Sequence, residues 1–90
     1  MKAKQIMYEG KVQGVGFRYT VKQIATGFDV CGSIRNLQDG RVELKVEGEA
    51  EEVDEFLEEI RQSSLAGHIL REEVLNLQGT LGLKGFQIIA

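Results

Sequence analysis

The sequence contains no proline and no tryptophan, and it has one cysteine and one histidine among 90 residues. Cys31 therefore cannot form an internal disulfide, and together with His68 it offers no spacing typical of a zinc or iron site. No apolar run approaches the roughly 18 residues that a membrane helix requires, and residues 1–4 do not lead into the apolar core of a signal peptide. These absences exclude disulfide scaffolds, metal folds and membrane spans. We expect a cytoplasmic protein that has no membrane partner.

Net charge and composition further limit the class of protein and its partners. Fourteen acidic and 11 basic side chains give a net charge of −3, which opposes binding to a nucleic-acid backbone. The hydrophobic fraction of 42% and the charged fraction of 28% are close to globular averages, so the chain is not a disordered tail. We expect residues 1–90 to form one domain with no nucleic-acid partner. No exposed apolar stripe forces pairing, so we also expect a monomer.

The first half of the chain alternates between strand and helix patterns. Residues 5–9 read as a short strand that ends at Gly10. Apolar residues then recur at spacings of three and four, which predicts a helix from Phe17 to about Gly27. Segments 30–37 and 41–47 flank Asp39-Gly40, and tolerance of positive φ at both positions of this dipeptide predicts a tight hairpin turn. In the second segment apolar and charged residues alternate, so one face of this strand should be buried and the other wet.

The second half adds one helix and two strands. Residues 50–60 place their apolar side chains on one helical stripe, and segments 69–77 and 86–89 are strand candidates separated by a glycine-containing loop. The order is β-α-β-β-α-β followed by a short C-terminal strand. This order predicts an α+β, ferredoxin-like sandwich with two helices on one face of an antiparallel sheet. Because many unrelated functions use this fold, it decides nothing about chemistry.

A glycine-rich loop between the first strand and the first helix is the candidate site. It lacks the Gly-Lys-Ser or Gly-Lys-Thr of a P-loop, and Tyr19 stands where a dinucleotide fingerprint starting at Gly14 would need glycine. What remains is a turn whose backbone N–H groups, together with the helix dipole and Arg18, suit an anion. Asn36, beside the hairpin turn, adds an amide that both donates and accepts. From these residues alone, two simpler interpretations stay open. The loop could be an ordinary strand-to-helix connection in which Arg18 is solvated, and Asn36 could be an asparagine that only flanks the turn.

Two segments of the chain resemble the signatures of the acylphosphatase family. The first is the run Gly10, Lys11, Val12, Gln13, Gly14, Val15, Gly16, Phe17 and Arg18. The second comprises Gly32, Ser33, Ile34, Arg35 and Asn36, followed by Gly40, Val42 and Gly48. With Gly85 to Ile88, the similarity covers nearly the whole chain, and two signatures at compatible separation favour a functional loop.

The resemblance implies hydrolysis of the carboxyl-phosphate bond of small acyl phosphates to a carboxylate and inorganic phosphate, without metal or cofactor. Carried onto this sequence, Arg18 and the backbone amides of residues 10–16 would bind the phosphoryl oxygens, and Asn36 would orient the attacking water. Neither signature sets up a serine, cysteine or histidine as a nucleophile, which suits direct attack by water on a substrate with a good leaving group. The predicted activity is that of a metal-independent acylphosphatase.

Two departures from the family pattern and two alternatives accompany this prediction. The family usually has an aromatic residue where Ser33 stands and a small apolar one where Ile34 stands, which concerns strand packing or the surface facing the acyl group.

One alternative is a noncatalytic anion-binding regulatory module, against which Arg18 and Asn36 together argue. The other is the amino-terminal portion of a larger carbamoyl-phosphate-using maturation factor. We do not expect it, because nothing follows Ala90 and no zinc motif is present.

Overall fold

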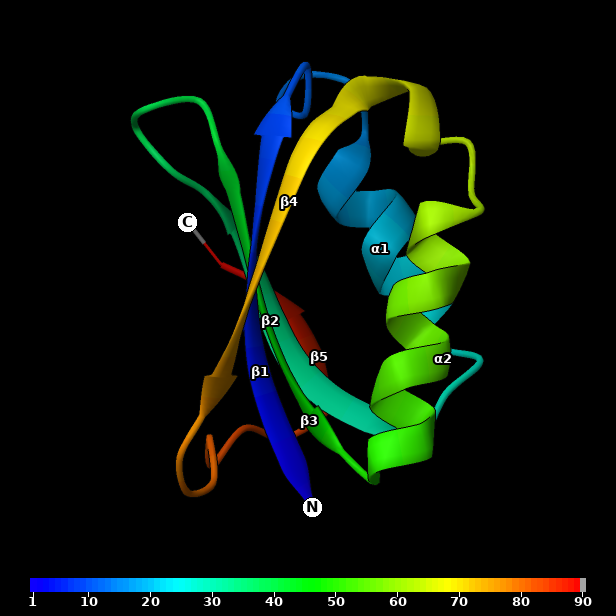
Figure 1. Ribbon diagram of the computed structural model, residues 1–90, viewed down its shortest axis with the longest axis vertical. Coiled ribbons are helices and arrows are strands. Elements are labelled where there is room, and N and C mark those ends of the chain that lie inside the picture. Colours follow the sequence, from blue (N-terminus) through cyan, green and yellow to red (C-terminus); the bar gives the residue numbers. More distant parts are fainter. Residues whose placement is uncertain (90) are drawn as a thin grey trace.

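The computed structural model describes residues 1–89 and contains five strands, two α-helices and one short 3-10 helix. In chain order the elements are β1 (Lys2–Gly10), α1 (Phe17–Ala25), β2 (Val30–Asn36), β3 (Val42–Gly48), α2 (Ala50–Arg61), η1 (Ala66–His68), β4 (Ile69–Leu77) and β5 (Phe86–Ile88). Both helices lie on the same side of the sheet (Figure 1). The predicted element order and the two-layer architecture are confirmed.

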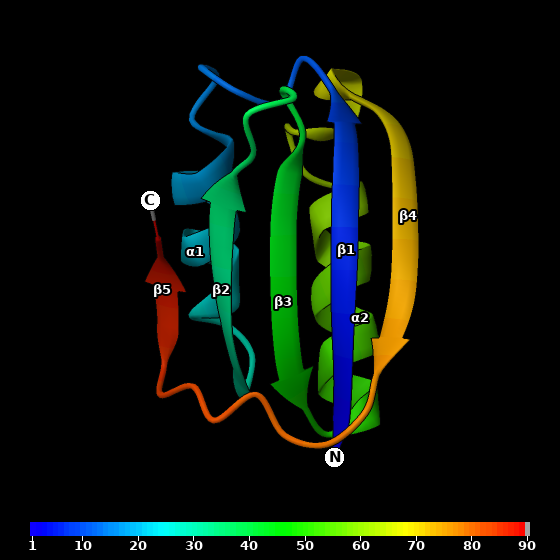
Figure 2. The ribbon, with the colours of Figure 1, turned by 90° about the vertical axis from the view of Figure 1, so that its left-hand side faces the viewer.

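The sheet has the strand order β4-β1-β3-β2-β5. Every pair among the first four strands is antiparallel, as predicted, whereas β5 pairs parallel with β2, with Phe86 opposite Gly32. The segment after β4 crosses one end of the sheet to its far edge, so the chain re-enters in the direction of β2 (Figure 2). The short C-terminal strand thus turns an antiparallel sheet into a mixed one.

The core lies between the sheet and the helices. Val42, Leu44 and Val46 of β3 have no exposed surface, and they face the predicted helix stripe. The buried residues of that stripe in α2 are Val53, Phe56, Leu57 and Ile60. Because burial of this apolar face stabilises both layers at about 25 cal/mol per Å², it fixes which side of each strand faces the helices.

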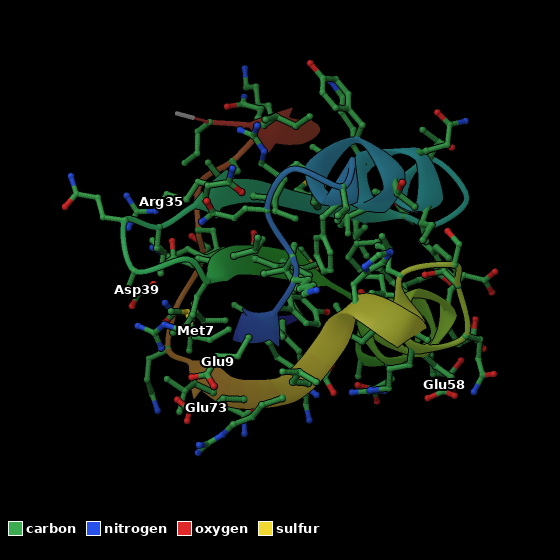
Figure 3. All side chains as sticks on the ribbon, turned by 90° about the horizontal axis from the view of Figure 1, so that it is seen from above. Met7, Glu9, Arg35, Asp39, Glu58 and Glu73 are labelled. Atoms are coloured by element: carbon green, nitrogen blue, oxygen red, sulfur yellow. The ribbon has the colours of Figure 1, made fainter. Side chains whose placement is uncertain are left out.

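The opposite face of β3 is not wet, which corrects one expectation. Glu43 and Glu47 are only 8% and 7% exposed. Glu43 accepts hydrogen bonds from Gln5 Nε2 at 2.8 Å and Arg35 Nε at 2.9 Å, and Glu47 accepts one from the Leu81 N–H at 2.9 Å. Figure 3 shows Met7, Glu9, Arg35 and Glu73 gathered on this side of the sheet, away from the helices. Neighbouring side chains and the β4–β5 segment therefore cover the acidic face of the strand.

Two local expectations also differ from the structure. β1 begins at Lys2, three residues earlier than predicted, because pairing with β3 and β4 extends over its whole length. At the hairpin only Gly40 has positive φ, at 95°, and Asp39 does not. The Gly40 N–H donates to the Leu37 carbonyl at 3.1 Å, and the Asp39 carboxylate accepts from the Arg41 N–H at 3.0 Å. The turn is therefore a three-residue loop that needs one left-handed position instead of two.

Ile34, one of the two departures from the family pattern, is a core residue. It has no exposed surface and pairs with Leu44 of β3 and Ile88 of β5. Trimming it to valine leaves a small cavity, so Ile34→Val is expected to lower the free energy of unfolding by about 0.5–1.5 kcal/mol. Denaturant unfolding monitored by circular dichroism measures this. Equal or higher stability of the variant would show that isoleucine overfills its place.

A polar cluster lies at the border of the core where β1 meets β4. The Tyr8 hydroxyl is buried, and no residue among 1–89 hydrogen-bonds to it. Glu72, its neighbour across the strand pair, is held by Arg61 Nε at 2.9 Å. Burial first, and then the Glu72 charge, raise the pKa of Tyr8, while Arg61 lowers it by a smaller amount. The folded protein therefore holds the Tyr8 proton more tightly than the unfolded chain does.

The sign of this shift gives an expected result at alkaline pH. The unfolded chain releases the Tyr8 proton at its ordinary pKa of about 10. The contribution of this proton to the free energy of unfolding is therefore complete below that pH and is lost as the pH rises above it. Tyr8→Phe should lose less stability between pH 9 and about pH 11 than the unmodified protein does, and at neutral pH it should be at least as stable, because the hydroxyl it removes lacks a protein partner. The matched control is Tyr19→Phe, since Tyr19 is 72% exposed. Identical alkaline profiles for the unmodified protein and Tyr8→Phe would contradict the assignment.

Candidate active site

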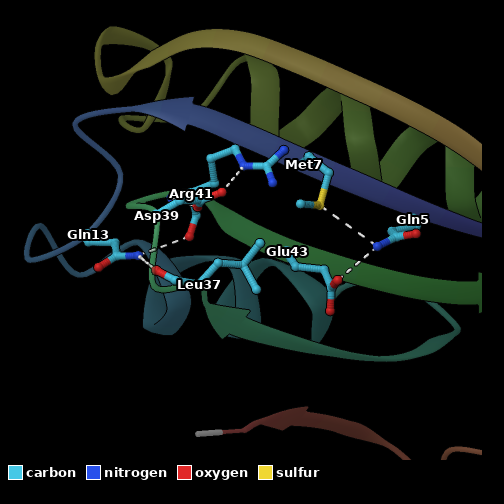
Figure 4. A network of polar contacts seen from close by, with 7 residues as sticks. All are labelled: Gln5, Met7, Gln13, Leu37, Asp39, Arg41 and Glu43. Atoms are coloured by element: carbon cyan, nitrogen blue, oxygen red, sulfur yellow. Dashed lines mark hydrogen bonds and ion pairs between the residues drawn. The ribbon is translucent and has the colours of Figure 1, made fainter.

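The glycine-rich loop, residues 10–16, is held at three points. Gly10 has a φ of 133° and lies so close to β4 that a Cβ would clash with the His68 carbonyl oxygen and come within 2.8 Å of the Leu70 nitrogen. Val12 is 1% exposed and belongs to the core. Gln13 Nε2 donates to the backbone carbonyls of Leu37 at 2.7 Å and Arg41 at 2.9 Å (Figure 4). The loop is thereby fixed to β4, to the core and to the β2–β3 hairpin.

The second half of the loop, Gly14–Gly16, presents its backbone freely. Gly14 and Gly16 adopt left-handed φ values of 80° and 77°, which cost any other L-residue about 1–2 kcal/mol, although a Cβ would meet nothing within 4 Å. Gly16 caps α1, and no side chain caps that end of the helix. Within residues 1–89, the N–H groups of residues 14–19 donate to no carbonyl or side chain. Six neighbouring donors at the positive end of a helix dipole have the geometry and the potential that suit an anion.

Arg18 occupies the first turn of α1. Its side chain is partly buried, and in the part of the chain that the structure describes it forms no ion pair. The first turn of α1 also contains no acidic residue. The charge of the guanidinium and the helix dipole therefore add without local neutralisation, and the planar fork of N–H donors is available for two oxygens of one anion.

Asn36 is the last residue of β2. It shares the face of Ile34, because alternate residues of a strand point to the same side, so it lies on the helix side of the sheet. Its Oδ1 is buried and has no hydrogen-bond partner among residues 1–89. A buried carbonyl oxygen without a partner is costly in a folded protein and indicates a position that a ligand or water satisfies.

The fold brings these groups to one end of the molecule. β2 ends at the end of the sheet where the glycine-rich loop enters α1 (Figure 2). The Gln13 hydrogen bonds join the loop to the residue that follows Asn36. A hollow of about 350 Å³ nearby is lined by Glu9, Gly10, Asp39, Gly40, Arg41 and Leu70, and contains neither Arg18 nor Asn36.

Arg41 is not a second free cation at this end. Its Nε lies 2.8 Å from Asp39 Oδ2. The hydrogen bond from the Arg41 backbone N–H is the largest cause that lowers the pKa of the Asp39 carboxyl, so Asp39 stays ionised as the partner of Arg41. Asp39 projects from the hairpin on the side away from the helices (Figure 3). Arg18 thus remains the guanidinium available to an anion at the glycine turn.

Residues 1–89 lack two features that would point to other functions. No group of three or more His, Cys, Asp or Glu side chains is arranged to hold a metal ion. No helix within the same range combines the length and apolar character required to cross a bilayer.

The acylphosphatase family model matches residues 4–88. The acylphosphatase of Bacillus pumilus is 53% identical over 55 residues, which is 61% of each chain, so that alignment spans less than two thirds of the relative.

Two solved structures share the fold at close similarity. The crystal structure of acylphosphatase from Bacillus subtilis superposes with a TM-score of 0.91 at 32% identity and covers 100% of both chains. Full-length HypF, solved in a phosphate- and nucleotide-bound form, matches 99% of this chain with a TM-score of 0.86 at 29% identity, over 12% of its own length. The resemblance seen in the two sequence signatures is confirmed: the chain belongs to the acylphosphatase family.

Proposed function

We propose that this protein hydrolyses the carboxyl-phosphate bond of small acyl phosphates, releasing a carboxylate and inorganic phosphate. The observation that carries the proposal is the donor-rich turn at residues 14–19, linked through Gln13 to the end of the strand that bears Asn36. Membership of the acylphosphatase family supports the reaction class.

The phosphoryl group binds at the glycine turn. Backbone N–H groups of residues 14–19 and the Arg18 guanidinium donate to its oxygens, while Val12 contributes structure, because its side chain is in the core. A loose phosphoryl-transfer transition state spreads negative charge over the equatorial oxygens, and fixed donors stabilise that distribution without reorganising. The substrate needs little from the protein beyond positioning and charge, since a carboxylate is a good leaving group.

Asn36 orients the nucleophile. Its Oδ1 lacks a partner among the described residues and can accept a hydrogen bond from a water molecule beside the bound phosphoryl group. The water oxygen bonds to phosphorus as the bond to the acyl oxygen breaks, and the bonding electrons leave with the carboxylate. The residues assigned to the site, Arg18, Asn36 and the loop 10–16, contain no side chain that acts as a base at neutral pH.

As a hypothesis, the phosphate of the substrate takes the proton of the attacking water. This hypothesis rests on the lack of a general base among the proposed site residues. We expect kcat to be level across neutral pH, with no enzyme group titrating there. A kcat profile that follows an essential enzyme group with a pKa near 7 would contradict it.

Hydrolysis of benzoyl phosphate and acetyl phosphate in the presence of EDTA tests the proposal. We expect phosphate release that EDTA does not affect and that inorganic phosphate inhibits competitively. Binding of inorganic phosphate without turnover of either substrate would instead indicate a noncatalytic anion-binding module. Turnover that EDTA abolishes would contradict the metal-independent mechanism.

A further inference from the structure

Gln13 belongs to the glycine-rich loop, but its side chain is already engaged. A glutamine amide has two N–H donors, and those of Gln13 are taken by the Leu37 and Arg41 carbonyls at 2.7 and 2.9 Å. The reverse orientation would place its oxygen against two other oxygens. No donor of this side chain is left for a phosphate, so membership of the loop does not make the Gln13 side chain a phosphate ligand.

The two carbonyls that Gln13 binds close the β2–β3 hairpin. The Leu37 N–H donates to the Arg41 carbonyl at 2.8 Å, so these two residues form the base of the turn, and Leu37 directly follows Asn36. The loop that presents the free N–H groups is thus joined, through one side chain, to the residue after the proposed water-orienting asparagine. Within residues 1–89, Gln13 makes the side-chain hydrogen bonds between this loop and the hairpin.

We infer that Gln13 is a positioning residue that sets the phosphate-binding turn against Asn36, and that it acts on turnover more than on phosphate binding. This inference rests on the proposed function. The donors at residues 14–19 and Arg18 stay in place without the Gln13 hydrogen bonds, because Gly10 and Val12 still fix the loop to β4 and the core. The alignment of water with phosphorus, however, depends on two separate segments. Misplacement on the order of 1 Å can reduce the rate about 10²-fold.

Gln13→Met is the informative variant, because methionine has similar length and no N–H donor. We expect kcat to fall roughly 10- to 100-fold while the inhibition constant of inorganic phosphate changes by less than about threefold. The matched control is Gln23→Met, since Gln23 is exposed on α1 and should leave both constants unchanged. Gln13→Leu, which removes the donors without adding a charge, provides a second variant if the methionine protein does not fold.

A second readout does not depend on activity. In two-dimensional amide spectra titrated with inorganic phosphate, the unmodified protein should show shifts at residues 14–19 and also at Asn36 and Leu37. In Gln13→Met the shifts should be confined to residues 14–19. If the unmodified protein does not hydrolyse acyl phosphates, the proposed function is wrong. The amide shifts then still test the role of Gln13, because they require phosphate binding and not turnover.

Three results would overturn the role of Gln13. One is unchanged turnover in both Gln13 variants. Another is a parallel loss of turnover and phosphate affinity, which would show that the Gln13 side chain itself helps to bind phosphate. The third is phosphate-induced shifts that reach Asn36 and Leu37 with or without Gln13, or that are absent from the unmodified protein.

Discussion

Arg18→Ala is expected to lower kcat/KM for benzoyl phosphate by roughly 10³-fold or more, the scale on which one arginine stabilises a phosphoryl-transfer transition state. The reason is that Arg18 forms no ion pair in residues 1–89 and stands in a helix turn without acidic residues. Its whole charge is therefore available to the substrate. Steady-state kinetics with benzoyl phosphate measures the loss.

The lysine substitution separates charge from geometry. Arg18→Lys keeps the positive charge but loses the planar fork, so we expect severe impairment in this variant too. Lys22→Ala is the matched control, since it removes an exposed cation from the last turn of the same helix. Full activity of Arg18→Lys would show that a point charge is sufficient, and equal losses in Lys22→Ala and Arg18→Ala would show a nonspecific effect of net charge.

Asn36→Ala is expected to lower kcat by roughly 10²- to 10³-fold, as removal of one preorganised polar group does in other active sites. Binding of inorganic phosphate should change little, because the proposed phosphate ligands lie on residues 14–19. The variant should also keep its stability, since Oδ1 of Asn36 has no partner among the described residues and its removal breaks no hydrogen bond of that oxygen. Kinetics and denaturant unfolding on the same preparation measure both quantities.

The control for this variant is Asn76→Ala, which removes an exposed asparagine from β4. Unchanged kcat in Asn36→Ala would remove this residue from the mechanism. A loss of activity that follows a loss of stability would assign Asn36 a structural role as a turn-flanking residue.

Most of the fold was predictable because its strongest signals are local. The apolar spacing of residues 53–60 and the alternation of residues 42–46 each follow one period, and the structure buries those positions. Strand β1 was predicted too short because Lys4 interrupts the pattern. Its Nζ reaches Asp54 of α2 at 3.1 Å, a contact between residues 50 positions apart that no local pattern contains.

The residue types of the candidate site were predictable, and its geometry was less so. The positive φ of Gly14 and Gly16 follows from glycine in a turn, and the signatures indicated Arg18 and Asn36. The hydrogen bonds of Gln13 to Leu37 and Arg41 could not be predicted, because they join segments that are distant in sequence and go to backbone carbonyls. The one sequence feature that pointed to these hydrogen bonds is the polar side chain of Gln13 between the apolar Val12 and Gly14. The burial of Glu43 could not be predicted from the local sequence either, because its hydrogen-bond partners Gln5 and Arg35 lie on two other strands.

The parallel pairing of β5 with β2 has a consequence for biosynthesis. Gly32 donates its N–H to the Gly85 carbonyl at 2.9 Å, and the Ile89 N–H donates to the Ile34 carbonyl at 2.9 Å. While the ribosome has not yet released residues 85–89, this edge of β2 has unpaired N–H and C=O groups, the type of strand edge that invites association between chains. β2, the strand that bears Asn36, therefore gains its second neighbour only after β5 emerges, and until then the nascent protein is exposed to intermolecular pairing at the strand that carries the proposed water-orienting residue.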